Sequence, residues 1–125
     1  MVDRGTVSVL GIDHVQVAAP AGCETAARVF YGDLLGLEEL PKPAALHARG
    51  GCWFRAGGQE LHVGVEQPFA PARKAHPGFV VSDLGELADR LRRAGVEVLP
   101  DDAIPGARRF HAADPFGNRL EFRQA

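Results

Sequence analysis

Residues 58–62 read Gly-Gln-Glu-Leu-His, and residues 117–121 read Gly-Asn-Arg-Leu-Glu. Each stretch joins a turn glycine to a short strand that ends in a side chain able to bind a metal. The glycine expected to end the preceding helix lies 26 positions before the last residue of each stretch, at Gly36 and at Gly95. The spacing predicts an internal duplication of one half-size unit, and such a unit is too short to bury its sheet face alone.

Hydrophobic periodicity predicts the same order of elements, β-α-β-β-β, in each half. In the first half we expect a helix over 23–35 and strands over 7–17 and near 38–40, 46–55 and 59–66. In the second half we expect a helix that starts at Leu84 after Ser82 or Asp83 as its cap, and strands over 76–81, 96–99, 108–113 and 119–123. This order predicts an α+β fold.

These elements indicate one domain, residues 1–125, built from two modules. Module 1 covers about 7–67, a linker with two prolines covers about 67–75, and module 2 covers about 76–125. The whole chain is short for two independent cores, so the modules are expected to pack together or against a second chain.

The composition excludes several classes of function. Lys and Arg number 14 against 16 Asp and Glu, so the basic surface that nucleic-acid binding requires is absent. No apolar run approaches the roughly 20 residues of a membrane span, and the N-terminus lacks the apolar core of a signal peptide. Cys23 and Cys52 form no disulfide framework and are expected to be buried thiols. We therefore expect a cytoplasmic protein with neither nucleic acid nor membrane as a partner.

Four residues of metal-binding type occupy equivalent positions in the two halves. His14 and His76 lie in the first strands, and His62 and Glu121 lie in the last. If the modules form a shared cup, all four can point into it. Imidazole and carboxylate suit one divalent ion such as Fe, Mn, Ni, Co or Zn. A single histidine in a strand is often only a hydrogen-bonded structural residue, and the repetition is what favours a metal here.

The hairpin at Gly57-Gly58 predicts what else lines the cup. A two-residue turn pairs Trp53 with His62 and Arg55 with Glu60, on one face of the sheet. By equivalence, Arg108 and Phe110 would line the cup from module 2. Such a wall suits a small anionic or carbonyl-bearing substrate. The aromatic residues could equally be core residues, and a longer turn would reverse the faces. His47 and His111 match no expected ligand position.

Four stretches together resemble the vicinal oxygen chelate superfamily, the group of glyoxalases, bleomycin resistance proteins and extradiol dioxygenases. They are 12–15 (Ile-Asp-His-Val), 30–37, 76–81 (His-Pro-Gly-Phe-Val-Val) and 114–122 (Asp-Pro-Phe-Gly-Asn-Arg-Leu-Glu-Phe). The similarity extends from about residue 10 to 123. It implies paired βαβββ modules whose eight strands form a mixed, curved sheet around a cup. It also implies metal ligands at His14, His76 and Glu121, with His62 at a fourth place where bacterial glyoxalase I has glutamate.

The resemblance implies two alternative functions. One is a divalent-metal-dependent enzyme that acts on a small oxygen-chelating substrate by isomerase or lyase, dioxygenase or transferase chemistry, with Glu121 or Glu60 as base. The other is a metal-free protein that sequesters a small molecule, as bleomycin resistance proteins do. Chains of this length in the superfamily are commonly homodimers. For cups shared between subunits, His14 and His62 would come from one chain, and His76 and Glu121 from the other.

Overall fold

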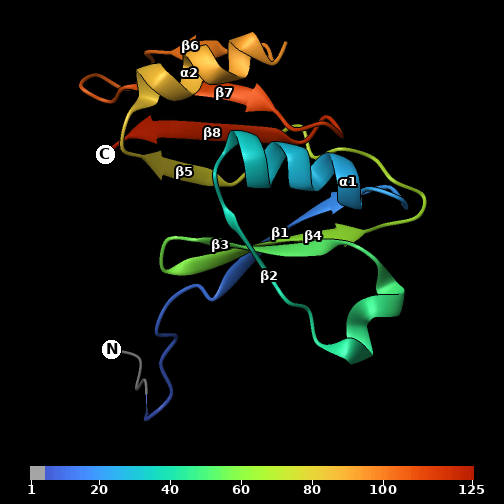
Figure 1. The fold of residues 1–125 in the computed structure, drawn as a ribbon. Helices are drawn as coiled ribbons and strands as arrows, with labels where there is room; N and C mark the ends of the chain where they lie inside the picture. The colour runs from blue at the N-terminus through green and yellow to red at the C-terminus, as the bar shows by residue number, and fades with distance from the viewer. Residues whose placement is uncertain (1–4) are drawn as a thin grey trace.

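Two four-stranded sheets, one from each half of the chain, form the framework of the molecule (Figure 1). The computed structural model describes residues 5–125. The first sheet contains β1 (His14–Ala19), β2 (Glu38–Leu40), β3 (Cys52–Ala56) and β4 (Gln59–Val65), and the second contains β5 (Gly78–Val81), β6 (Leu99–Asp101), β7 (Arg109–Ala113) and β8 (Arg119–Gln124). Their orders, β1-β4-β3-β2 and β5-β8-β7-β6, are equivalent, and in each the first pair is parallel and the others antiparallel. The predicted α+β repeat is confirmed.

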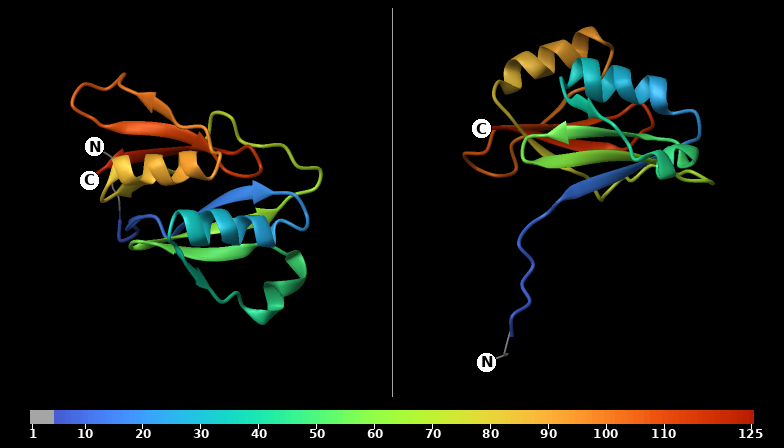
Figure 2. Two further views of the ribbon diagram at one scale, coloured as in Figure 1. Left: turned by 45° about the horizontal axis from the view of Figure 1, so that its top comes forward. Right: turned by 60° about the horizontal axis from the view of Figure 1, so that its bottom comes forward.

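The helices lie on the same side of both sheets (Figure 2). In module 1, α1 (Glu24–Ala27) continues directly into the π-helical η1 (Arg28–Leu34), and a 3-10 helix, η2 (Ala44–Arg49), precedes β3. In module 2, α2 (Leu84–Arg93) starts at Asp83, whose side chain accepts a hydrogen bond from the Glu86 amide at 3.0 Å. This arrangement leaves one face of each sheet without a helix, and we call it the helix-free face. None of the helices in residues 5–125 is long and apolar enough to cross a membrane.

The core fills the space between the helices and the sheets. Strand residues that alternate with the helix-free positions point into it, among them Phe54 and Leu61 in the first sheet and Leu120 and Phe122 in the second. Both cysteines are free and buried, as expected. Burial is the main reason that the pKa of each thiol is raised to about 11.

A buried polar network joins the two modules at the turn before β8. The Tyr31 hydroxyl donates to Asp114 at 2.7 Å. The Asn118 side chain donates to the Ala18 carbonyl at 2.7 Å and accepts from the Ala72 amide at 3.0 Å. The Asp-Pro-x-Gly-Asn stretch therefore has a structural role, since it fixes β1 of one module and the linker against the end of the other.

The boundaries of four predicted strands are wrong by two residues or more. The strand expected over 76–81 begins at Gly78, so His76 lies just before it. The first strand starts at His14 rather than at residue 7, because its register with β4 begins at the His14–Glu60 pair, next to a backbone hydrogen bond from the Glu60 amide to the Asp13 carbonyl at 3.1 Å. The expected strand over 46–55 is divided between η2 and β3, and the break falls at Gly50 and Gly51, which both have positive φ. The strand expected over 96–99 is displaced to β6.

Candidate metal centre

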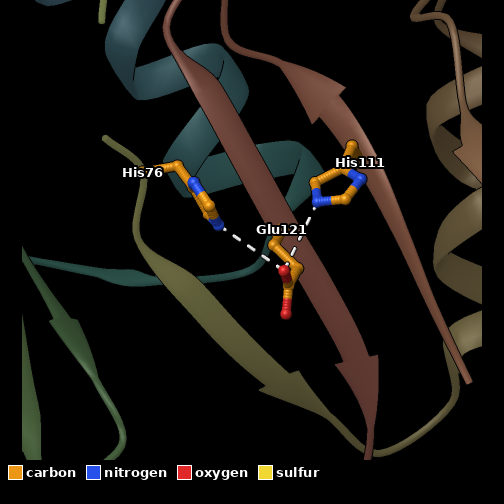
Figure 3. Close-up of side chains that lie close together, drawn as sticks. All are labelled: His76, His111 and Glu121. Carbon is orange, nitrogen blue, oxygen red and sulfur yellow. Dashed lines mark ion pairs between the residues drawn. The ribbon is translucent and has the colours of Figure 1, made fainter. Parts of the chain in front are cut away.

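The second sheet gathers three potential ligands on its helix-free face. His76 precedes β5, while His111 of β7 lies directly opposite Glu121 of β8. Glu121 Oε1 lies 3.5 Å from His76 Nε2 and 3.3 Å from His111 Nε2 (Figure 3). One ligand atom from each of the three residues can be chosen so that all lie within 4.8 Å of one another. We call this group the module 2 triad.

The module 2 triad fits a divalent transition metal. Ligand atoms about 2.0–2.2 Å from an ion stand roughly 3–3.5 Å apart, close to the distances observed here. Two imidazole nitrogens and one carboxylate leave coordination positions open, which a catalytic centre requires. Two arginines compete with a metal for these atoms, because Arg109 Nη1 lies 2.8 Å from Glu121 Oε1 and Arg119 Nη2 lies 3.2 Å from His111 Nε2.

Arg109 also determines the charge state of Glu121. It contacts Glu121 through Nη1 and Asp101 through Nη2, the latter at 3.1 Å. Burial acts to raise the pKa of the Glu121 carboxyl, but the Arg109 guanidinium and the hydrogen bonds from Arg109, His76 and His111 outweigh burial. The pKa of Glu121 is therefore lowered, and the side chain is a carboxylate at neutral pH.

The first sheet carries a stack of three rings on its helix-free face. His62 of β4 lies between His14 of β1 and Trp53 of β3. Its ring centroid is 4.2 Å from that of His14 and 4.0 Å from that of Trp53, with interplanar angles of 13° and 3°. His62 Nε2 also lies 2.9 Å from Glu60 Oε1, and His14 Nδ1 lies 2.9 Å from Asp13 Oδ2.

This stack does not hold a metal as it stands. The lone pair of an imidazole nitrogen lies in the plane of its ring, and two nearly parallel rings stacked with centroids 4.2 Å apart do not direct their lone pairs at one ion. At least one of His14 and His62 must rotate before both can bind the same metal. The carboxylates of Asp13 and Glu60 each engage one nitrogen of a ring, and a metal-bound imidazole commonly keeps such a hydrogen bond on its second nitrogen.

The structure brings the four predicted ligands together as two separate pairs. His14 contacts His62 in module 1, and His76 contacts Glu121 in module 2. Within residues 5–125, the module 2 triad is the only group of three such residues with a metal-compatible spacing, and it contains no residue of module 1. The predicted pairings of Trp53 with His62 and of Arg55 with Glu60 are confirmed.

In module 2, the residues of β7 that lie on the helix-free face are shifted by one position from the prediction. Phe110 pairs with Phe122 and is buried in the core, so it and Arg108 do not line the helix-free face as expected. The turn between β7 and β8 has five residues, 114–118, whereas the turn between β3 and β4 has two, and an odd difference exchanges the faces. Arg109 and His111 occupy the expected places instead. The expected strands over 108–113 and 119–123 already leave five residues for this turn, so pairing residues across it, instead of transferring the faces from module 1, would have found Arg109 and His111.

Comparison with known protein families agrees with the fold. A family model described as the Glyoxalase/Bleomycin resistance protein/Dioxygenase superfamily matches residues 11–122. The chain belongs to this superfamily. A glyoxalase family protein from Bacillus anthracis is 55% identical over 94% of this chain and 97% of its own, with a TM-score of 0.91. No curated protein matches the sequence at a significant level.

More distant members share the fold. A lactoylglutathione lyase from Agrobacterium tumefaciens has a TM-score of 0.73 at 22% identity, and the match covers 94% of this chain and 95% of the lyase. A fosfomycin resistance protein from Listeria monocytogenes has a TM-score of 0.74 at 16% identity, with 94% and 95% covered. The names of these two proteins describe different functions, so the shared architecture alone selects no substrate.

Proposed function

We propose that this glyoxalase superfamily protein is a divalent-metal-dependent enzyme that acts on a small substrate with two adjacent oxygens. The observation that carries the proposal is the module 2 triad, in which His76, His111 and Glu121 offer ligand atoms within 4.8 Å of one another. Superfamily members commonly use a divalent metal. Bound there, Fe, Mn, Ni, Co or Zn would act as a Lewis acid on the substrate oxygens.

The charges around the triad support this role for Glu121. Because the pKa of Glu121 is lowered, the carboxylate needs no deprotonation before it binds a cation. The same property makes Glu121 a weak proton acceptor. Glu60, whose carboxylate is partly exposed on the helix-free face and contacts His62, is better placed to remove a proton from a substrate carbon.

The remaining polar residues would position the substrate. Trp53, which is partly buried at one end of the ring stack, offers a flat apolar surface against which a planar or conjugated group can pack. Arg55 lies beside Glu60 on the same face of the hairpin and can meet an anionic group at the rim. Arg109 remains with Glu121 and Asp101 and holds that side of the cup in place.

A complete site would require both half-sites. We propose a homodimer in which the helix-free face of module 1 from one subunit meets that of module 2 from the other. His14 and His62 would then face His76 and Glu121 across the interface. This arrangement accounts for the observation that each pair forms within its own sheet while no described group joins the two.

Metal titration of the apoprotein tests the proposal. His76→Ala and Glu121→Ala should each weaken binding of Co²⁺ or Ni²⁺, measured by calorimetry, by at least about 100-fold, while the far-UV spectrum stays unchanged. His47→Ala is the matched control, because His47 lies in η2 and contacts only the Lys42 carbonyl among its observed partners. Wild-type affinity in either triad variant would contradict the proposed site.

His62 needs its own variants. If it is a ligand after rotation, His62→Glu should retain the metal, whereas His62→Ala should lose most of the affinity. If it only supports the wall of the cup, His62→Ala should cost about 10- to 100-fold in affinity. Unchanged affinity in His62→Ala would exclude it from the centre.

The ring stack favours a second candidate function. A protein that keeps His14, His62 and Trp53 stacked, and Glu121 paired with Arg109, can bind a planar small molecule without any metal. In that case the apoprotein would show no stoichiometric binding of Fe, Mn, Ni, Co or Zn. Quenching of the Trp53 fluorescence by aromatic compounds would be the expected signal, since Trp53 is the single tryptophan.

A further inference from the structure

A guanidinium stands in front of the ring nitrogen that His111 would offer to a metal. Arg119 Nη2 lies 3.2 Å from His111 Nε2, and the same nitrogen lies 3.3 Å from Glu121 Oε1. An imidazole nitrogen has one lone pair, which lies in the plane of the ring, and an arginine can only donate to it. A metal bound about 2.0–2.1 Å from Nε2 needs that lone pair. Arg119 therefore has to move before His111 can bind a metal.

Arg109 does not have to move in the same way, because a carboxylate can serve several partners at once. Its two oxygens give Glu121 about four lone pairs, and the polar contacts described for this side chain within residues 5–125 all involve Oε1. A metal can use another lone pair of Glu121 while Arg109 stays between Glu121 and Asp101, at 2.8 and 3.1 Å. Metal binding therefore displaces Arg119 and leaves Arg109 in place.

Once displaced, Arg119 has no acidic side chain to receive it. In residues 5–125 its guanidinium forms no ion pair with a carboxylate, and Asp101, the other carboxylate next to the triad, is already bound to Arg109. Arg119 projects from β8 on the helix-free face, two positions before Glu121. Its neighbour on β7 is Ala113, whose small side chain leaves room for the guanidinium to turn. The displaced guanidinium would lie beside the metal without a counter-charge.

The charges around a metal-loaded triad favour an anion at this place. A divalent ion would join two guanidiniums, while the negative groups in contact with the triad and its arginines are Glu121 and Asp101. A guanidinium binds carboxylate or phosphonate oxygens through two parallel hydrogen bonds. We propose that Arg119 binds an anionic group of the substrate and becomes available for it only when a metal takes His111 Nε2. This inference rests on the proposed metal centre and adds a substrate class, with a carboxylate or phosphonate beside the two chelating oxygens.

Metal and anion then bind cooperatively. The metal releases the guanidinium of Arg119 from His111, and the anion stabilises the guanidinium in its displaced position. Coupling of this kind is reciprocal and typically amounts to about 5- to 150-fold in affinity. The metal-free protein should therefore bind the anionic group weakly, and the substrate should bind after the metal.

Calorimetric titration with Co²⁺ tests the displacement. Arg119→Gln should bind Co²⁺ at least about 10-fold more tightly than the wild type, because a positive charge in contact with the ligand nitrogen is removed. Arg123→Gln is the matched control. Arg123 lies on the same strand and face, two positions after Glu121, and has no described contact with the triad. It should change the affinity for Co²⁺ by less than about 3-fold, since an exposed charge is screened by salt.

A second titration tests the anion. Methylphosphonate in millimolar excess should tighten Co²⁺ binding to the wild type and to Arg123→Gln by at least about 5-fold, and should leave Arg119→Gln unchanged. Acetate in a parallel titration shows whether a carboxylate or a phosphonate is preferred. Complexes of the probe with free Co²⁺ affect all three proteins equally. By reciprocity, ³¹P NMR should show tighter binding of methylphosphonate to the Zn²⁺-loaded wild type than to the metal-free protein.

The outcomes separate this inference from the metal centre on which it rests. Tighter Co²⁺ binding and loss of the probe effect in Arg119→Gln, but not in Arg123→Gln, would support the role of Arg119. Co²⁺ binding in Arg119→Gln that is no tighter than in Arg123→Gln would overturn the displacement and leave the metal centre standing. A probe effect of equal size in all three proteins, or none in the wild type, would overturn the anion site alone. Absence of Co²⁺ binding from all three proteins would overturn the metal centre and this inference together.

Discussion

At the scale of single residues, Asn118 shows how one buried side chain can connect two modules. Its amide donates to the Ala18 carbonyl and to Asp114 and accepts from the Ala72 amide. Asn118→Ala removes three hydrogen bonds made by a fully buried side chain, so we expect a loss of about 2–4 kcal/mol in the free energy of unfolding. Urea denaturation measures this loss in the free energy of unfolding. Asp102→Ala, an exposed control, should change stability by less than about 0.5 kcal/mol.

Glu121 gives a prediction about pH. Since the folded-state pKa of its carboxyl is lowered, ionised Glu121 adds stability above the unfolded pKa of about 4.3, and this stability is lost as the pH falls through the folded pKa. The difference in unfolding free energy between the wild type and Glu121→Gln should therefore be largest near pH 7 and shrink below about pH 4. Urea denaturation at a series of pH values, with chelator present, measures it. A difference that is constant down to pH 2 would contradict the Arg109–Glu121 pairing.

At the scale of elements, the β7–β8 hairpin places the adjacent residues Phe110 and His111 on opposite faces of the sheet. Phe110 packs on Phe122 in the core, with ring centroids 5.2 Å apart, whereas His111 faces Glu121. We expect Phe110→Ala to cost about 3–5 kcal/mol of stability with little effect on metal affinity in the protein that remains folded. His111→Ala should cost about 1 kcal/mol of stability and weaken metal binding. Thermal unfolding and metal titration of the two variants should give opposite rankings, and equal rankings would contradict the observed register.

The same hairpins show what the sequence could predict. Gly57-Gly58 favours a two-residue turn. The pattern alone therefore predicted that one face of the sheet carries Trp53, Arg55, Glu60 and His62. The turn at 114–118 has no such restriction on its length. Its geometry depends on Asp114 accepting hydrogen bonds from the amides of Phe116 and Asn118, and this arrangement sets the five-residue length. The prediction placed this turn correctly but took the faces of module 2 from module 1, and the resulting shift of one residue exchanged Phe110 for His111.

At the scale of the whole molecule, the duplication predicted which residues would pair but not how the pairs would meet. A repeat fixes equivalent positions within each sheet, and His14 with His62 and His76 with Glu121 are found there. The relation between the sheets depends on contacts distant in sequence, such as Tyr31 with Asp114. Periodicity also predicted that the strand over 7–17 would start at residue 7, because it detects apolar residues without showing whether a neighbouring strand pairs with them.

Subunit mixing tests whether each cup is shared between chains. If it is, a His14→Ala chain and a Glu121→Ala chain each lack a complete site alone, but their heterodimer combines an intact module 1 from the Glu121→Ala chain with an intact module 2 from the His14→Ala chain. The visible absorption of bound Co²⁺ reports the ligand set, so the mixture should regain the wild-type spectrum at about one site per heterodimer. A mixture whose spectrum equals the average of the two variants, with subunit exchange shown by differently tagged chains, would mean that each chain builds its centre alone. The module 2 triad would then be the whole metal site.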